Sequence, residues 1–438
     1  MDLLRFFRPR PAKDKPGAVT DPRVLRGENE AIASAVAAFL TQTRLFDRDE
    51  YLRTYPDVAK SGLDPLHHFA LVGVQAGRKF TSEQTIARLW REVLENAPTV
   101  VSPAPMTDPA RYRAAIYVSS LGNFFMTEIA EVLKAGFDDL GVRAELCDEK
   151  AEPRDATHHI VVAPHEFFFL GEGRRWANDA FVSRAIMVAT EQLQTAWFAR
   201  SLVFLLRAKA VADMNEQSAA ILRKAGVRAV SVQPGFSAAF KPLATPASGA
   251  TLAALAPLPD NVRAFDIAAP RLADRPLDLL FLGSHSARRE RLLATYADKF
   301  ADLQTFIHRR HMDRPLQPAA DPMAATAVTA ALLQRSKLLL NLHRDDYTYF
   351  EWWRLMQAFW LKTVVVTEPC FPHSIYKPGI HYFEEAPDRI PGLVEWLVRT
   401  KDGQAKAEEV RARAHRDFMA HSTAKVAAMA LLAIGLET

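Results

Sequence analysis

Short apolar runs alternate with amphipathic stretches along most of the chain. Between residues 113 and 235 the strand-like runs are AAIYVSS, VRAELCD, HHIVVAP, AIMVATE, AVADMN and RAVSVQPG, and helical patterns such as MTEIAEVLKAGFDDLG and SAAILRKAG separate them. From residue 277 a second series reads LDLLFLGS, ARRERLLATYADKF, LQTFIHR, a helix near 324–334, KLLLNLH, a Trp-rich helix, TVVVTE and IHYFEE. Strands that alternate with helices build a parallel sheet, because right-handed crossovers place the helices on its faces. The pattern therefore predicts an α/β protein with two Rossmann-like lobes.

A helical region, residues 28–96, precedes the two lobes. In its segment LFDRDEYLRTYPDVAKSGLDPLHHFALVGVQAGRKF, apolar residues recur at helical spacing, while Gly62, Gly73 and Gly77 mark turns and helix ends. We expect a small α-helical module of short helices here. Residues 1–27 are rich in Pro and Lys and are expected to form a disordered lead-in.

Changes in the pattern set the remaining domain boundaries. The N-terminal lobe is predicted over 110–240 and the C-terminal lobe over 277–403. Residues 241–276 are rich in Ala and Pro without a clear period, so we expect them to link the lobes. The final segment, 404–438, is expected to form one long Ala-rich helix. Because no strand follows it, we expect this helix to pack back across the lobes.

Composition narrows the class of protein. A chain of 438 residues is too long for one comfortable core, which agrees with two domains and an appendage. The net charge is +4, and the basic residues are scattered among 51 acids, which is too balanced for a protein whose main partner is nucleic acid. Cys147 and Cys370 are far apart and lack metal-type spacing, so neither a disulfide framework nor a zinc site is expected. A reducing, cytoplasmic setting fits.

The sequence also bears on the membrane. No window approaches the ~20 apolar residues that a spanning helix needs, and the N-terminus lacks the apolar region of a signal peptide. The opening MDLLRFFRPRPAKDKPG is basic and aromatic. We favour a frayed tail, because one turn with a few basic residues binds weakly. The alternative is a peripheral contact with the inner face of the cell membrane.

Candidate chemistry in the N-terminal lobe lies in loops that follow strands, where open parallel sheets bind ligands. Gly122 and Asn123 follow the first strand. A glycine there lets backbone approach a ligand, and the next helix begins with partial positive charge that attracts an anion. The alternative is an ordinary tight turn with a polar cap.

Two further loops of this lobe carry acids or amides. His165 and Glu166 stand just past a strand, and a histidine beside a carboxylate can take a proton from an attacking hydroxyl. A structural histidine is the alternative. Glu191 and Gln192 end another strand, where they either contact sugar hydroxyls or cap a helix.

Two loops of the C-terminal lobe are also candidates. Gly283 and Ser284 follow a strand, and Arg288 begins an Arg-rich helix, which is a good cradle for a diphosphate without a metal. A solvated basic face is the alternative for most of these arginines. The consecutive Asp345 and Asp346 suit a divalent metal on a diphosphate, but the preceding His343 and Arg344 favour helix capping or sugar contact.

The Trp-rich helix carries Glu351, Arg354 and Gln357, which are spaced three apart and therefore share nearly one face. A polar stripe on a helix otherwise rich in Trp is costly to bury unless it meets a polar ligand. We therefore expect this face to line a crevice or an interface.

Several of these segments resemble GT-B glycosyltransferases, in particular the bacterial group similar to spore-maturation-type glycosyltransferases. The segments are LLFLGSHSARRERLL, SKLLLNLH, FEWWRLMQAFWLKTVVVTE and KPGIHYFEEAPDRIPGLVEWLV. The likeness covers most of 277–400, and covers 113–235 only by layout plus EQLQTAWF and QPGF. The helical module resembles the YLxxYPDVAxSGxxPLxHFxxxGxxEGR module attached to many bacterial glycosyltransferases and surface-polysaccharide proteins, with Gln75-Ala76 where that module often has a Glu.

This resemblance implies a nucleotide-sugar donor held mainly by the C-terminal lobe, an acceptor held mainly by the N-terminal lobe, and neither an essential metal nor a cofactor. It implies that the Gly283 loop meets the diphosphate, that the loop from His343 to Tyr349 meets the donor sugar or phosphate, and that Arg354 meets phosphate. Two positions depart from the family pattern. Gln357 stands where a Glu usually accepts hydrogen bonds from the ribose, and Lys362 stands where Gly is common. Glu351 is a candidate for the role of the missing carboxylate.

The interpretation we favour is metal-independent transfer of a hexosyl or related sugar from a nucleotide sugar to a saccharide, lipid-linked glycan or protein, during synthesis of a bacterial surface polysaccharide or glycoprotein. If the reaction inverts, His165 with Glu166 is the expected base, whereas a retaining reaction needs none. One alternative is a non-catalytic scaffold or binding protein with this fold, which the Gln357 departure favours. Another is a sugar-nucleotide epimerase. The Trp-rich and C-terminal helices leave room for a homodimer contact.

Overall fold

The computed structural model describes residues 22–95, 108–255, 258–265, 271–310, 315–318 and 321–436. Residues 1–21 of the predicted lead-in lie outside the described residues, and a helix begins at Pro22. The chain divides into two compact units. The first unit draws on residues 1–122, 145–232 and 430–438, and the second on residues 123–144 and 233–429.

The first unit begins with the N-terminal module, residues 22–95. Its helices are α1 (Pro22–Thr43), α2 (Arg48–Thr54), α3 (Pro56–Ser61), α4 (Pro65–His68), the π-helical turn η2 (Phe69–Gly73), α5 (Val74–Ala76) and α6 (Glu83–Glu95). Local sequence explains the short lengths. The Asp47 and Asp64 side chains cap α2 and α4, while Gly62 and Gly77 end α3 and α5 in the left-handed conformation. The predicted helical region is confirmed.

A six-stranded sheet follows in the order β2-β1-β3-β4-β5-β6. Its strands are β1 (Arg113–Tyr117), β2 (Arg143–Cys147), β3 (His158–Val162), β4 (Ala185–Ala189), β5 (Ala210–Asp213) and β6 (Ala229–Ser231). The pairs from β1 through β3, β4 and β5 to β6 are parallel. The intervening helices are α7 (Phe124–Asp139), α8 (Pro164–Phe167), α9 (Asp179–Val182), α10 (Ala196–Leu205) and α11 (Glu216–Lys224), of which α7 is grouped with the second unit. Strands β3, β4 and β5 are buried throughout, as a sheet covered on both faces requires.

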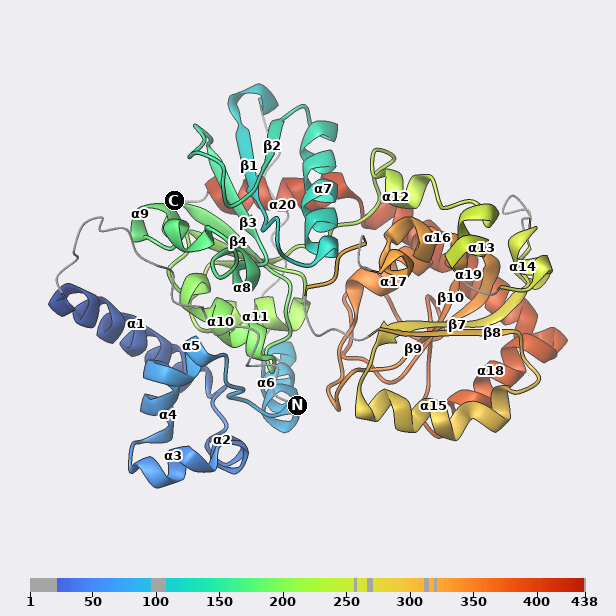
Figure 1. Cartoon of the computed structure of the whole chain (residues 1–438), viewed down its shortest axis with the longest axis horizontal. Coiled ribbons are helices and arrows are strands. Elements are labelled where there is room, and N and C mark those ends of the chain that lie inside the picture. The colour runs from blue at the N-terminus through green and yellow to red at the C-terminus, as the bar shows by residue number, and fades with distance from the viewer. Residues whose placement is uncertain are drawn as a thin grey trace. The chain divides into compact units, whose positions relative to one another are not determined.

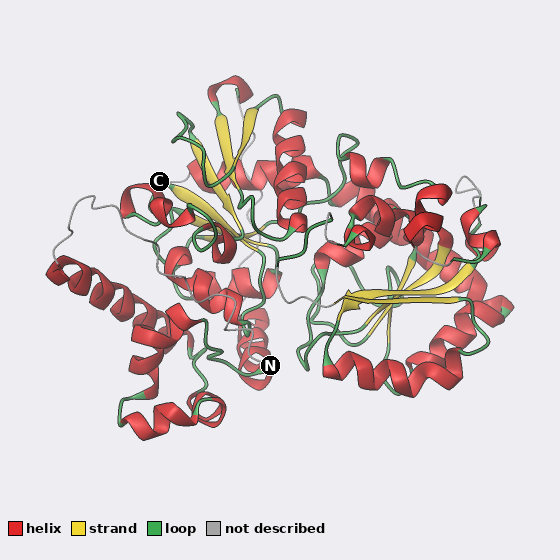
Figure 2. Cartoon of the chain, viewed as in Figure 1, coloured by secondary structure: helices red, strands yellow, loops and turns green. Residues whose placement is uncertain are grey.

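The second unit contains a five-stranded parallel sheet in the order β11-β10-β9-β7-β8. Its strands are β7 (Leu277–Ser284), β8 (Thr305–Arg310), β9 (Ser336–Asn341), β10 (Val364–Thr367) and β11 (Phe383–Glu384). The helices are α15 (Ala287–Phe300), α16 (Thr326–Arg335), α17 (Trp352–Trp360), α18 (Ile390–Arg399), α19 (Lys401–His421) and the start of α20 (Ala424–Leu436), whose residues from 430 on are grouped with the first unit. In this unit α15 lies below the sheet and α16 and α17 lie above it in the view of Figure 1. The strands of both sheets are flanked by helices (Figure 2), and the predicted pair of parallel α/β lobes is confirmed.

Two segments differ from their predicted secondary structure. Residues 241–276 contain α12 (Lys241–Ala244), α13 (Gly249–Leu255), α14 (Asp260–Arg263) and the 3-10 turn η5 (Leu272–Asp274). These helices are too short to show a period, and they are held by single buried residues such as Leu252 and Val262. The expected helix over 404–436 is broken into α19 and α20, because Phe236 hydrogen-bonds to the backbone on both sides of Thr423.

Each sheet has one point where the order of strands along the chain reverses. In the first sheet this switch point lies between β1 and β3, and in the second it lies between β7 and β9. The carboxyl ends of strands flanking such a point form the usual ligand crevice of open parallel sheets. A ligand is therefore expected at the carboxyl ends of β1 and β3 in the first sheet and of β7 and β9 in the second.

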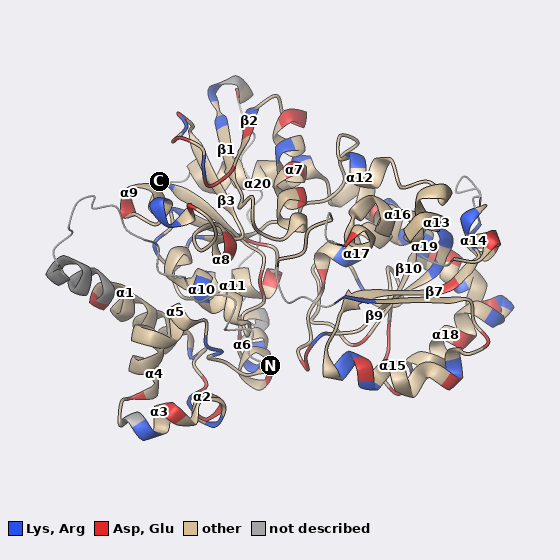
Figure 3. Cartoon of the chain, in the orientation of Figure 1, with Lys and Arg blue, Asp and Glu red and all other residues tan. Residues whose placement is uncertain are grey.

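Charge and hydropathy add two observations. Helix α15 carries both basic and acidic residues at each of its ends, as Figure 3 shows. Among the described residues, none of the helices is both long and apolar enough to cross a membrane.

Candidate functional site

Arg289 joins the two strand ends at the switch point of the second sheet. Its guanidinium donates to the Ser284 carbonyl at 3.0 Å, at the end of β7, and to the Leu342 carbonyl at 2.7 and 2.9 Å, just past β9. Gly283 makes room for this arrangement, because a Cβ there would lie 2.8 Å from the Phe281 ring and 3.2 Å from Arg289 Nη1. A buried arginine, held by carbonyl groups, thus occupies the predicted crevice.

Arg354, one of the predicted site residues, lies beside it. It lies in the first turn of α17, and its Nη1 donates to Asn341 Oδ1 at 2.7 Å, at the carboxyl end of β9. Glu351 stands between the two arginines, with Oε2 2.9 Å from Arg354 Nη1 and Oε1 3.4 Å from Arg289 Nη2. Burial acts to raise the pKa of Glu351, but the charges of Arg354 and Arg289 outweigh it, so the net shift is downward and the carboxylate stays ionised.

Arg310 is the third arginine of this group and was not singled out in the sequence. It ends β8, its Nη2 donates to the Met323 carbonyl at 2.7 Å, and its Nε lies 3.9 Å from Asp321. Burial is the main cause that lowers the pKa of Arg310 to about 10, and the charge of Arg354 adds to it. The predicted strand-like run LQTFIHR stops one residue before Arg310, so no direct signal in the sequence pointed to it.

Arg289, Arg310 and Arg354, which we call the arginine cluster, are short of negative charge. Burial, followed by the charge of Arg354, lowers the pKa of Arg289 to about 10, and Arg344 acts in the same direction. Glu351, beside Arg289 and Arg354, and Asp321, 3.9 Å from Arg310, compensate these three positive charges only in part. An anion bound beside it would relieve the repulsion and receive charge-assisted hydrogen bonds.

Arg288 is engaged with carboxylates of its own unit, and its predicted donor contact stays a prediction. It forms a two-pronged ion pair with Glu368, one arm of which is 2.8 Å long, and its Nε donates to Asp346 at 2.7 Å. Glu368 is buried and also accepts from the His343 backbone N–H at 2.6 Å. The hydrogen bonds with Glu368 are the main cause that raises the pKa of Arg288. Arg288 thus holds the loop from His343 to Asp346 in place.

Three other predicted donor-binding residues lie in the second unit. Gln357 is buried on α17, one turn beyond Arg354, and Tyr349 is half-buried in the loop before α17. Asn123 precedes α7, and its Oδ1 accepts from the Leu316 N–H at 2.8 Å. Its side chain is therefore used to hold this backbone segment, and the predicted donor contact of Asn123 stays a prediction.

The predicted residues of the first unit converge at its own switch point. His165 and Glu166 lie in α8, directly after Ala163, whose positive φ of 54° is unusual for a residue with a Cβ. Such strained conformations cost about 1–3 kcal/mol and cluster at functional sites. A Cβ on Gly122 would lie 2.2 Å from Glu166 Oε2, so the turn after β1 lies directly against the Glu166 carboxylate.

The imidazole of His165 faces two carboxylates. Its Nε2 lies 3.5 Å from Glu191 Oε1 and 4.0 Å from Glu166 Oε1, and its side chain is almost completely buried. Burial, followed by the charge of Arg200 on α10, lowers the pKa of His165 to about 3. The ring is therefore neutral near pH 7. It is a weak base by itself, and Glu191 is placed to stabilise a proton that it gains.

Asp213, at the end of β5, was missed in the sequence because it reads as part of a buried strand. It is 1% exposed, and its Oδ1 accepts from the Asn215 N–H at 2.8 Å. Burial, with a contribution from the charge of Glu191, raises its pKa well above the ordinary value. Gln192 is instead used in its own turn, where its side chain accepts from Gln194 and its carbonyl from Thr195.

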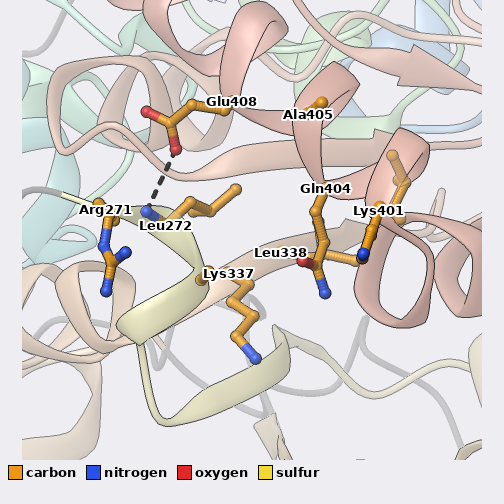
Figure 4. Close-up of a pocket in the computed structure, with 10 residues that line it drawn as sticks. Arg271, Leu272, Lys337, Leu338, Lys401, Gln404, Ala405 and Glu408 are labelled. Carbon is orange, nitrogen blue, oxygen red and sulfur yellow. Dashed lines mark hydrogen bonds between the residues drawn. The ribbon is translucent and has the colours of Figure 1, made fainter.

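A pocket of about 310 Å³ lies elsewhere in the second unit, near the start of β9 (Figure 4). Its lining includes Leu338 and Leu397, with Lys337 and Lys401 at the rim, and the Leu272 N–H donates to Glu408 at 3.2 Å. This is the amino end of the strand, opposite the arginine cluster. None of the predicted site residues lines it.

Comparisons with known proteins find structural likeness only. No family model and no curated protein matches the chain. One similar solved structure is an alpha-glucosyltransferase in complex with UDP and a DNA containing a HMU base, with 10% identity, coverage of 74% of this chain and 100% of that one, and a TM-score of 0.46. Another is HepE from Anabaena in complex with UDP and glucose, with 10% identity, coverage of 73% and 98%, and a TM-score of 0.45.

A third is a glycosyltransferase from Rickettsia africae, with 9% identity, coverage of 74% of this chain and 97% of that one, and a TM-score of 0.40. At these identities and scores the likeness concerns the general arrangement of strands and helices. It says nothing of individual residues.

Proposed function

We propose that the chain is a glycosyltransferase that takes a sugar from a nucleotide-sugar donor. The arginine cluster carries this proposal. Three guanidinium groups at the carboxyl ends of neighbouring parallel strands, one buried and two partly exposed, with one carboxylate between two of them, favour a ligand that carries more than one negative charge. A diphosphate has that charge, and the start of α15 and the start of α17 add partial positive charge from their backbone N–H groups.

The donor chemistry follows from the same groups. As the acceptor oxygen bonds to the anomeric carbon, the bond from that carbon to the diphosphate breaks and negative charge grows on the departing oxygen. Arginines that already repel one another stabilise that charge more in the transition state than in the ground state, which is the condition for catalysis. Gln357 can accept a hydrogen bond from the ribose as a neutral amide.

The first unit supplies a place for the acceptor. His165 is neutral, and the carboxylate of Glu191 lies 3.5 Å from its Nε2. In an inverting reaction the acceptor hydroxyl proton passes to His165, and Glu191 stabilises the imidazolium that forms. The proposed acceptors are a saccharide, a lipid-linked glycan or a protein, in the synthesis of a bacterial surface polysaccharide or glycoprotein. The likeness of the N-terminal module to modules of such proteins supports this context.

A transfer assay tests the proposal. The protein is screened against a panel of UDP-, GDP-, ADP- and dTDP-sugars by thermal shift, and active donors are then followed for hydrolysis and transfer. We expect Arg354→Gln to lower kcat/KM by about ten- to a hundredfold, because one or two charge-assisted hydrogen bonds are lost. Lys299→Gln removes an exposed charge from the far end of α15 and is the control, with activity unchanged.

The outcomes separate the alternatives. Donor binding without transfer or hydrolysis would contradict catalysis and favour a binding protein. Interconversion of the sugar while it stays on the nucleotide would favour an epimerase. Normal turnover in Arg354→Gln would remove the arginine cluster from the mechanism.

A further inference from the structure

The N-terminal module is in direct contact with the helix beside His165. Helix α5 packs against α10, and Figure 1 shows the two side by side in the first unit. Gly77, which ends α5, is the closest point. A Cβ there would lie 2.8 Å from Arg200 Nε, 3.3 Å from Arg200 Cγ and 3.1 Å from the Ala196 carbonyl oxygen. The backbone of the module therefore lies against the side chain of Arg200.

Arg200 links this contact to the candidate site. It lies on α10, which also packs against α8, the helix of His165. Arg200 as a whole is 8% exposed, and its guanidinium carbon lies 5.7 Å from the centre of the Phe169 ring, so its position is set by packing on both sides. Its charge is one of the two causes that lower the pKa of His165, after burial.

The charged groups around His165 come from four elements. Glu166 is on α8 itself, Glu191 follows β4, Arg200 is on α10, and Asp213 at the end of β5 has its pKa raised in part by the charge of Glu191. Arg200 is the cation among them. It opposes protonation of the ring, whereas the carboxylates that flank Nε2 favour it.

We propose that Arg200 is a positioning residue for His165 and that the N-terminal module, through Gly77, holds Arg200 in place. The module then has a role in the candidate acceptor site, whether or not it also binds a partner. A shift of the module would move the guanidinium and change how readily His165 accepts a proton. The catalytic meaning of this coupling rests on the proposed function, whereas the coupling itself does not.

Two glycines of the module offer a matched comparison. Gly62 and Gly77 both end short helices with similar positive φ angles, 71° and 66°. A Cβ on Gly62 would meet nothing within 4 Å, whereas one on Gly77 would press on Arg200. Gly62→Ala and Gly77→Ala therefore carry the same backbone strain, and only the second disturbs Arg200.

NMR of the full chain with ¹³C-labelled histidine observes His165 directly. The His165 signal is the one that disappears in the His165→Gln variant. We expect Gly77→Ala to move the Cε1 and Hε1 signals of His165 and Gly62→Ala to leave them unchanged. Arg200→Met should raise the pKa of His165 by roughly one unit, because a like charge is removed, and Arg200→Lys should restore most of the original value.

Equal His165 signals in the two glycine variants, or a His165 pKa that Arg200→Met leaves unchanged, would overturn the coupling. Activity is a separate readout. If the protein transfers sugar, Arg200→Met should move the acid limb of the kcat profile to higher pH while KM for the donor stays constant. Absence of any transfer in the wild type would count against the proposed function and leave the NMR result standing.

Discussion

Buried charge is the most informative feature at the scale of single residues. The arginine cluster and the His165 site each place titratable groups where burial disfavours their charged form, and each does so at a switch point. His165, Glu166, Glu191 and Arg354 were predicted because they follow strand ends or share a helix face. Arg310, Asp213 and Arg200 were not, because nothing in a local pattern says that a charged residue will be buried by elements far away in the chain.

Glu128 offers a test of buried charge outside both sites. It lies on α7, is 9% exposed, and accepts from the Thr326 hydroxyl at 2.5 Å. Burial is the main cause that raises its pKa from 4.5 to about 7. The folded protein therefore holds the proton up to about pH 7, whereas the unfolded chain releases it near 4.5. The stabilisation from this group is present below pH 4.5 and is lost as the pH rises through 7.

We predict that the Glu128→Gln variant, which cannot ionise at this position, does not lose stability as the pH rises through 7. At pH 8 its free energy of unfolding should exceed that of the wild type by about 2–3 kcal/mol, and the difference should shrink towards pH 4.5. Urea unfolding at pH 5 and pH 8 measures it. Asp139→Asn, an exposed change on the same helix, is the control. A difference that is the same at both pH values would show that ionisation of Glu128 is not its cause.

At the scale of elements, the strands were the most predictable part of the chain. Runs such as HHIVVAP and KLLLNLH are apolar on both faces and bounded by turns, and they form β3 and β9. Helices without a period of their own were less predictable. The short helices in 241–276 depend on a few buried residues, and the break between α19 and α20 depends on hydrogen bonds from Phe236, which is distant in sequence.

The end of α17 shows how an element boundary can carry strain. Lys362 has φ of 56°, a conformation that costs a side chain with a Cβ about 1 kcal/mol, and it lies between α17 and β10. This conformation gives a physical reason for the glycine that the resembling family often has at this position.

We predict that Lys362→Gly raises the free energy of unfolding by about 0.5–1 kcal/mol, since the glycine relieves the strain. Lys362→Ala is the matched variant, because it removes the same side chain and keeps the strain, so it should give no gain. Chemical denaturation of the three proteins provides the comparison. An equal gain in the alanine variant would mean that the lysine side chain, rather than the backbone, is unfavourable.

At the scale of the whole molecule, the two-lobe α/β class could be predicted because alternating strands and helices leave few other folds. A donor lobe and an acceptor lobe were expected from the family resemblance alone, because a switch point shows where a ligand binds and leaves its identity to the side chains gathered there. The second unit gathers arginines, and the first gathers carboxylates around a neutral imidazole. This difference underlies the proposal that one binds a donor anion and the other an acceptor hydroxyl.

The most direct test of this account is a calorimetric titration of the full chain with nucleotide sugars and with the matching nucleosides. We predict that at least one nucleotide sugar binds at least tenfold more tightly than its nucleoside. The difference should shrink as salt is raised, and Arg354→Gln should abolish most of it, because the diphosphate makes the contacts with the arginine cluster. Binding that is equally tight for nucleoside and nucleotide sugar, or no binding of any nucleotide sugar, would contradict it.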